Sequence, residues 1–230
     1  MTTQVVILAA GMGSRLGRSL PKPLTPLHDG RTIMQQQFDN IHAAFGSDAA
    51  VTIVVGYKLE YIVESFPDAQ FVYNERYDQT NTSKSLLRAL RASNSGGVLW
   101  MNGDVVFDPK VLIRGAAMVA RDQNFVTVNT SSVSDEEVKY TTTAEGYINL
   151  LSKTVQGGLG EAVGINYISS SDKNTLVRHL QRVDDQDYFE RAIELAIEKD
   201  RLLVEPVDIS DLYAVEVDFQ EDLERANLFV

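Results

Sequence analysis

The segment from position 11 to position 22 combines glycines with basic side chains, a pattern that suits the binding of an anion. Gly11 and Gly13 follow a short apolar run, and Arg15 and Lys22 come after them. Glycines after a buried strand let the backbone approach a phosphate closely, and its N–H groups then point at that phosphate. Residues 1–28 contain three basic side chains and no acidic one, although the whole chain has a formal net charge of −11. The sequence therefore predicts a local phosphate site at this loop.

Three common loop motifs do not fit this segment. The dinucleotide-binding motif G-x-G-x-x-G would need a third glycine where Leu16 stands. The Walker motif G-x-x-x-x-G-K-[ST] finds no second glycine at the required distance from Gly11 or Gly13. The nucleophile motif G-x-S-x-G fails because Ser14 directly follows Gly13 and is followed by Arg15. We therefore do not expect a dehydrogenase, a P-loop enzyme or an α/β-hydrolase.

The loop instead resembles the signature of nucleoside-triphosphate transferases, which join a nucleotide to a phosphorylated alcohol or sugar. The pattern is L-A-A-G-x-G-[ST]-R-[LM] followed by P-K-x-L, and its fixed positions are matched from Leu8 to Leu24. Arg15 and Lys22 would be catalytic, because fixed cations stabilise the charge that develops on the departing pyrophosphate. The resemblance implies nucleotide binding by Leu8, Ala9, Ala10, Gly11, Met12, Gly13, Ser14, Arg15 and Lys22.

A second segment narrows the resemblance to the branch of phosphocholine and phosphonate cytidylyltransferases. Residues 74–86 (NERYDQTNTSKSL) look like a segment typical of that branch. The branch usually has two adjacent asparagines here, whereas this chain has Asn81 followed by Thr82. The resemblance implies nucleotide contacts from Asn81, Thr82 and Ser85. The alternative is that residues 81–85 only cap a helix.

Two aspartates are candidate ligands of Mg²⁺, whose preferred ligands are oxygens and which would bridge phosphate oxygens. Asp104 lies just past an apolar run, and the carboxyl end of such a strand opens onto the ligand crevice of a parallel sheet. Gly103 and Asp104 resemble the family's G-D position, which contacts metal and nucleotide. Asp218 resembles the second metal ligand in the family's E-I-D-x-x-E-D-L ending. The alternatives are an Asx turn at Asp104 and a capping box of Asp218 with Glu221.

The second half of the chain is expected to bind the acceptor. By the same resemblance, Lys153 would hold the acceptor phosphate and Glu161 its polar or cationic head. Glu216 is the reserve candidate for the metal, because it shares a strand face with Asp218. The residues expected on the acceptor side are Lys139, Lys153, Glu161, Gly164, Tyr188 and Glu216.

The sequence also bears on whether the acceptor is choline-like. A choline group would require an aromatic cage, and the second half of the chain contains Tyr140, Tyr147, Tyr167, Tyr188 and Tyr213 as candidates. Trp100 is expected in the core, because it lies within a buried strand. The family often has a tryptophan before its final motif, where this chain has Ala214 and Val215. Aminoalkyl phosphonates or another small phosphorylated alcohol therefore stay open as acceptors.

The elements that position these residues alternate between strand and helix. Apolar runs rich in β-branched residues predict strands, and apolar residues at helical spacing predict helices. Such alternation is typical of a parallel sheet covered on both faces. The predicted strands are 4–10, 51–55, 70–73, 98–101, 125–129, 202–207 and 213–217, and the predicted helices are 32–45, 59–66, 82–92, 109–120, 175–182, 188–199 and 219–229. Between 138 and 169, short β runs separated by glycines predict a small antiparallel portion.

We therefore expect one α/β nucleotidyltransferase domain over residues 1–230, with a Rossmann-like, mostly parallel mixed sheet and helices on both faces. Residues 1–130 would mainly bind the nucleotide and residues 131–230 mainly the acceptor. The chain has no cysteine, which excludes disulfides, thiolate nucleophiles and thiolate zinc sites. No signal peptide is recognisable, and no apolar stretch approaches the roughly 20 residues of a membrane span.

The resemblance implies a Mg²⁺-dependent cytidylyltransferase, and we expect it to be cytoplasmic because neither a signal peptide nor a membrane span is recognisable. It would transfer CMP from CTP to a small phosphate or phosphonate and release pyrophosphate. Residues 181–230 contain fifteen acidic and five basic side chains, which argues against nucleic-acid or membrane partners. One alternative is a sugar-1-phosphate nucleotidyltransferase that uses UTP or dTTP, and another is a catalytically silent nucleotide-binding domain. The sequence is compatible with a homodimer.

Overall fold

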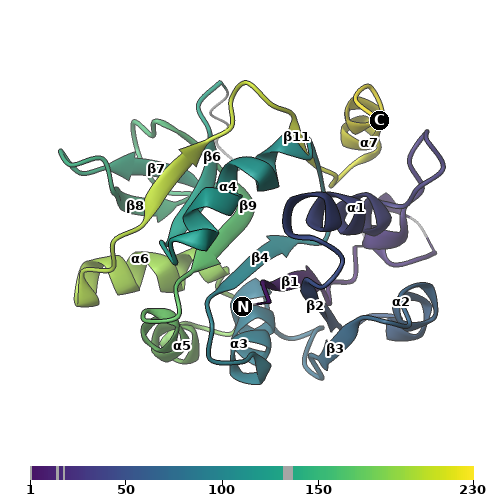
Figure 1. Ribbon diagram of the computed structural model, residues 1–230, viewed down its shortest axis with the longest axis horizontal. Coiled ribbons are helices and arrows are strands. Elements are labelled where there is room, and N and C mark those ends of the chain that lie inside the picture. Colours follow the sequence, from purple (N-terminus) through teal and green to yellow (C-terminus); the bar gives the residue numbers. More distant parts are fainter. Residues whose placement is uncertain (1, 14–15, 18, 132–136) are drawn as a thin grey trace.

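A computed structural model describes residues 2–13, 16–17, 19–131 and 137–230. The main sheet has the strand order β10-β6-β9-β4-β1-β2-β3, with β4 in the middle (Figure 1). Strands β1 (Gln4–Ala9), β2 (Ala50–Val55), β3 (Gln70–Tyr73) and β4 (Val98–Asn102) run parallel to one another, as the alternating sequence pattern predicts. The carboxyl ends of these strands therefore meet at one edge of the sheet.

The second half of the sheet is mixed. Strand β9 (Gly160–Ile168) lies antiparallel between β4 and β6 (Phe125–Asn129), and β10 (Glu205–Asp208) pairs parallel with β6. Strands β7 (Lys139–Thr142) and β8 (Ile148–Ser152) form the small antiparallel portion expected between 138 and 169. The predicted mostly parallel mixed sheet is confirmed.

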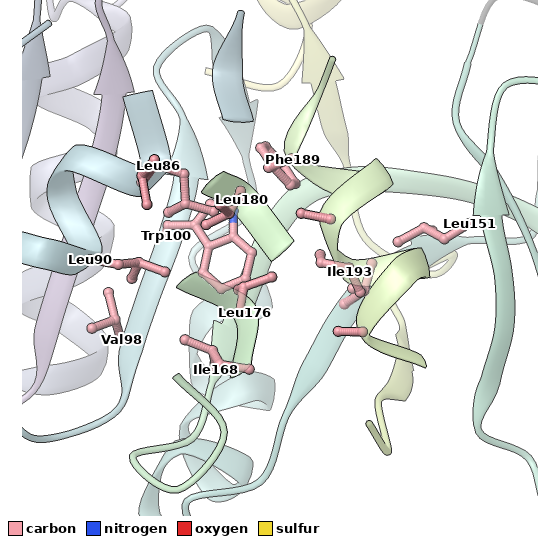
Figure 2. Close-up of a cluster of buried hydrophobic side chains, with 14 of the residues drawn as sticks. Leu86, Leu90, Val98, Trp100, Leu151, Ile168, Leu176, Leu180, Phe189 and Ile193 are labelled. Carbon is pink, nitrogen blue, oxygen red and sulfur yellow. The ribbon is translucent and has the colours of Figure 1, made fainter. Parts of the chain in front are cut away.

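Helices cover both faces of the sheet. Successive residues of a strand point to opposite faces, and in the central strands the residues on both faces are apolar. Val5 and Ile7 of β1 pack with α1 (Ile33–Phe45), α2 (Leu59–Ser65) and α4 (Lys110–Ala120). Val6 and Leu8 pack with α3 (Thr82–Ala92), α5 (Lys173–Arg182) and α6 (Phe189–Asp200). Figure 2 shows part of this second cluster around Trp100, which is 1% exposed. The prediction that Trp100 belongs to the core is confirmed.

One strand was not expected. Strand β5 (Val105–Phe107) pairs antiparallel with β11 (Ala214–Glu216) in a separate two-stranded sheet. Three residues are too few to show a periodicity, and the partner lies more than 100 residues away along the chain. This pairing brings the segment after β4 next to the segment before α7 (Gln220–Ala226).

Other differences concern element ends. Helix α5 starts at Lys173 rather than at 175, the strand expected at 202–207 is β10, and the helix expected at 219–229 is α7. A short 3₁₀ helix, η2 (Lys22–Leu24), follows the glycine loop. Among the described residues, no helix is both long and apolar enough to cross a membrane. The assignment of the chain to one domain with two functional halves stays a prediction.

Candidate active site

A cavity of about 660 Å³ opens at the carboxyl ends of β1 and β4. Its other walls come from η2, the first residues of α3 and α6, strand β9, and the segment from β11 into α7. Most residues that the sequence singled out line this cavity: Leu8, Ala9, Gly11, Gly13, Lys22, Asn81, Thr82, Gly103, Asp104, Lys153, Glu161, Gly164, Tyr188, Glu216 and Asp218. The fold thus brings the expected nucleotide and acceptor residues to one place.

Four predicted residues are not among those that line the cavity. Ala10 is buried and its carbonyl accepts the Tyr57 N–H. The Ser85 hydroxyl accepts Asn74 Nδ2 at 3.0 Å, because it belongs to the buried face of α3. Met12 is exposed and Lys139 is buried on β7. Ser14 and Arg15 lie outside the described residues, so the catalytic role expected of Arg15 stays a prediction.

Lys22 lies between two of the predicted carboxylates. Its Nζ donates to Asp104 Oδ2 at 2.7 Å and to Asp218 Oδ1 at 2.5 Å. Burial favours the neutral amine, but the two carboxylates outweigh it and raise the pKa of Lys22. The Lys22 ammonium is therefore a fixed charge at the floor of the cavity.

Asp104, Glu216 and Asp218 form a group that fits a divalent cation. One carboxylate oxygen from each lies within 4.8 Å of the others. The nearby Asp104 charge, together with burial, raises the pKa of Glu216 well above its usual value. Converging carboxylates repel one another, and a hard divalent cation with oxygen ligands relieves that repulsion. The donor set therefore matches the metal site that the sequence predicts.

The turn between β4 and β5 fixes Asp104 in place. The Gly103 N–H donates to the Leu8 carbonyl at 2.9 Å, and a Cβ at Gly103 would lie only 2.8 Å from that oxygen. The Val217 N–H donates to the Asp104 carbonyl at 3.0 Å, which joins this turn to the chain after β11. The β5–β11 pairing thus sets the spacing of Asp104 from Asp218.

Three amide side chains of α1 support this turn and were not anticipated. Gln37 Nε2 donates to the carbonyls of Asn102 and Val105 at 2.9 Å each. Gln36 Nε2 and Asn40 Nδ2 both donate to the Phe107 carbonyl, at 2.6 and 2.8 Å. All three amides are at most 4% exposed. Polar residues on the apolar face of a predicted helix were the signal that would have revealed them.

The proposed capping alternatives resolve in different ways. Asp222, rather than Asp218 with Glu221, caps α7, because its Oδ2 accepts the N–H groups of Asp218 and Phe219 at 3.1 and 2.9 Å. Asn81 does cap α3: its Oδ1 accepts the Thr82 N–H at 2.8 Å. Asn81 also lines the cavity, so capping and a nucleotide contact are compatible there.

The end of the cavity where the sequence predicts acceptor binding carries three carboxylates, one lysine and one tyrosine. Lys153 Nζ lies 4.9 Å from the centroid of the Tyr188 ring. Burial, then the Glu161 charge, raises the pKa of Glu137. Sequence reasoning missed Glu190, which lines the cavity and is 8% exposed. Burial raises the pKa of Glu190 to about 7.

The sequence of this chain is similar to those of known nucleotide-transferring proteins. Residues 5–163 match the family described as MobA-like NTP transferase domain. The CMP-5'-(3-aminopropyl)phosphonate synthase of Streptomyces rubellomurinus is 37% identical over 123 residues. That match covers 50% of this chain and 19% of the synthase, so the chain spans only a small part of this relative.

Solved structures share the fold over nearly the whole chain. The CTP:phosphocholine cytidylyltransferase from Streptococcus pneumoniae superposes with a TM-score of 0.75 at 16% identity, covering 99% of both chains. A UDP-glucose pyrophosphorylase complexed with UDP-glucose also gives a TM-score of 0.75, at 14% identity, and covers 99% of this chain and 98% of its own. The chain thus belongs to the MobA-like NTP transferase domain family, a family of nucleotidyltransferases.

Proposed function

We propose that this chain is a cytidylyltransferase that transfers CMP from CTP to a small phosphate or phosphonate. The observation that carries the proposal is the cluster of Lys22, Asp104 and Asp218 at the floor of the cavity, beside the glycine loop. An oxygen of the acceptor attacks the α-phosphorus of CTP, the bond to the bridging oxygen breaks, and pyrophosphate leaves. The acceptor oxygen is already anionic near neutral pH, so the reaction needs no general base.

The residues of the nucleotide end would bind and orient the triphosphate. Nothing in the described structure lies within 4 Å of a Cβ built at Gly11, so its backbone is open to a phosphate. Asp104 and Asp218 would hold Mg²⁺ with Glu216 beside them, and the ion would supply Lewis-acid stabilisation of phosphate charge. Lys22 would stabilise the charge on the departing pyrophosphate. Arg15, which precedes Lys22 in the sequence, is expected to assist it.

CTP is supported by sequence rather than by geometry. The relative that is 37% identical over 123 residues is a CMP-5'-(3-aminopropyl)phosphonate synthase, whose name indicates a CMP-linked product. Residues 74–86 are also similar to a segment of the cytidylyltransferase branch. The alternative is transfer from UTP or dTTP to a sugar 1-phosphate. It is supported by the equally similar fold of the UDP-glucose pyrophosphorylase. The carboxylates at the acceptor end favour a cationic acceptor over a neutral sugar.

Pyrophosphate release tests this proposal. The protein with Mg²⁺ is assayed with CTP, UTP, dTTP, ATP and GTP, each against 2-aminoethylphosphonate, phosphoethanolamine, phosphocholine, glycerol phosphate and glucose 1-phosphate. We expect turnover with CTP and a small acceptor. Turnover with UTP or dTTP and glucose 1-phosphate would replace the proposal by its alternative. Nucleotide binding without any turnover would favour the alternative of a catalytically silent nucleotide-binding domain.

A further inference from the structure

Glu190 is a buried carboxylate that neither the nucleotide site nor the metal group uses. It lies in the first turn of α6, is 8% exposed and lines the cavity. Its Oε2 has no hydrogen-bond partner among the described residues. A buried acceptor atom without a donor destabilises a folded chain, so its presence in a cavity wall points to a donor that the ligand brings.

The helix does not account for this burial. An acidic residue in a first turn interacts favourably with the helix dipole, but an exposed side chain would do so without losing its hydration. The core instead holds this turn rigidly: Phe189 packs edge-on against Trp100 with 5.6 Å between ring centroids (Figure 2). The Phe189 N–H also donates to Thr82 Oγ1 at 3.3 Å. Glu190 is therefore fixed against the cavity by its neighbour.

The surroundings of Glu190 are negative. Glu137 and Glu161 line the same end of the cavity, and Lys153 supplies one positive charge there. The Glu137 charge and the Lys153 charge act on Glu190 in opposite directions. Three of the side chains that line this end are carboxylates, which attract a cation.

An aromatic ring in this wall already contacts a cation. Tyr188, the residue before Phe189, is 41% exposed and lines the cavity. The Lys153 ammonium already lies 4.9 Å from its ring centroid, within the range of a cation–π contact. Tyr188 and Glu190 thus offer a cation one aromatic face and one carboxylate oxygen.

We infer that the acceptor carries an ammonium group with N–H bonds, which donates to Glu190 Oε2 and packs against the Tyr188 ring. This inference rests on the proposed function and narrows it to acceptors whose ammonium group keeps at least one N–H bond. A quaternary ammonium has no hydrogen to donate and would leave Glu190 Oε2 without a partner. Glu190 is accordingly the specificity-determining residue of the acceptor end.

Two acceptors of equal size test the inference. 2-Aminoethylphosphonate and propylphosphonate differ only in an ammonium in place of a methyl group. With CTP and Mg²⁺, we expect kcat/KM to favour the amine by about 10²-fold, because the uncharged acceptor leaves a buried charge unpaired. Phosphoethanolamine is likewise expected to be used better than phosphocholine.

Two variants of α6 test whether Glu190 causes the preference for the amine-bearing phosphonate. Glu190→Gln is expected to reduce the ratio between the two phosphonates to below about tenfold, because an amide lacks the charge that attracts the ammonium. Glu198→Gln makes the same change on an exposed position of the same helix and is expected to keep the full ratio. Thermal unfolding at pH 5 checks that both variants fold.

Each other outcome overturns either this inference or the proposed function. Equal use of both phosphonates by the wild type, or an unchanged ratio in Glu190→Gln, overturns the ammonium site while leaving CTP turnover intact. A raised KM for CTP in Glu190→Gln with an unchanged ratio overturns it too, by placing Glu190 at the nucleotide. If no nucleotide is turned over, the proposed function fails. Calorimetry of 2-aminoethylphosphonate binding then tests the ammonium site by itself. Binding of 2-aminoethylphosphonate that Glu190→Gln alone weakens supports the site, and absence of binding overturns it.

Discussion

At the proposed nucleotide end of the cavity, the buried cation Lys22 is bonded to two carboxylates, whereas at the proposed acceptor end Oε2 of the buried Glu190 has no hydrogen-bond partner among the described residues. Lys22 Nζ lies 2.7 Å from Asp104 and 2.5 Å from Asp218. The charge of Lys153 lowers the pKa of Glu190, but less strongly than burial raises it.

This difference separates a preformed site from one that the ligand completes. Paired charges keep their geometry without a ligand, so the nucleotide end is organised before binding. An unpaired buried charge destabilises the free protein and is relieved only by a ligand of opposite charge. Substitutions at the proposed nucleotide end should therefore reduce turnover. Substitutions at the proposed acceptor end should reduce the selectivity between acceptors.

The largest effect is expected from Asp104→Asn. Loss of a carboxylate from the group of Asp104, Glu216 and Asp218 should reduce metal-dependent turnover by more than about 10³-fold, since a metal contributes several kcal/mol of charge stabilisation. Pyrophosphate release measured against Mg²⁺ concentration checks this. Asp108→Asn is the control, because Asp108 does not belong to that group and its Oδ1 accepts the Lys110 N–H at the start of α4. A variant at 104 that keeps full activity and its response to Mg²⁺ would remove Asp104 from the metal site.

Lys22→Met comes next. We expect kcat to fall on the order of 10²–10³-fold, because the charge on pyrophosphate loses a fixed cation. Without the ammonium between them, Asp104 and Asp218 should also bind Mg²⁺ more tightly in the absence of nucleotide, which calorimetry measures. Lys110→Met, an exposed change on α4, is the control. Unchanged kcat together with unchanged Mg²⁺ affinity would show that the ion pairs are only structural.

Glu190→Gln should stabilise the free protein at high pH. The pKa of Glu190 rises from 4.5 to about 7 on folding, so the folded state binds a proton more tightly than the unfolded state. Its contribution to stability is therefore present below pH 4.5 and is lost as the pH rises through 7, by up to about 3 kcal/mol. The variant and the wild type should differ little at pH 4, and the variant should be more stable at pH 8. Denaturant unfolding at both pH values measures this, with Glu198→Gln as the control, and a variant less stable at pH 8 would contradict it.

The smallest effect is expected from Gly11→Ala. An alanine Cβ meets nothing within 4 Å in the described structure, so the free energy of unfolding should not change. The methyl group would stand where a phosphate approaches, and the affinity for CTP should fall roughly tenfold, or ~1.4 kcal/mol. Gly13→Ala is the contrasting variant, because it has a φ of +57° and its Cβ would lie 2.9 Å from Lys22 Cβ. Unchanged CTP affinity in Gly11→Ala would separate Gly11 from the phosphates.

Most of the fold was predictable because its elements are local patterns. The parallel strands β1 to β4 and the helices between them follow from apolar periodicity within short windows. β5 was not predictable, since three residues show no period and their partner β11 lies far along the chain. The supporting role of Gln36, Gln37 and Asn40 was not predictable for a related reason. The partners of these amides are backbone carbonyls of segments distant in the sequence.

For this protein, the sequence alone determined the glycine loop, the parallel order of strand and helix, and the candidates Lys22, Asp104 and Asp218. These depend on residue types at short fixed spacings, which the chain displays directly. Only the tertiary structure decided that Lys22 bridges the two aspartates, that Asp222 rather than Asp218 caps α7, and that Glu190 is buried in the cavity wall. Burial and ion pairing depend on which distant segments pack together, and the pairing of β5 with β11 and the docking of Phe189 on Trp100 set that packing.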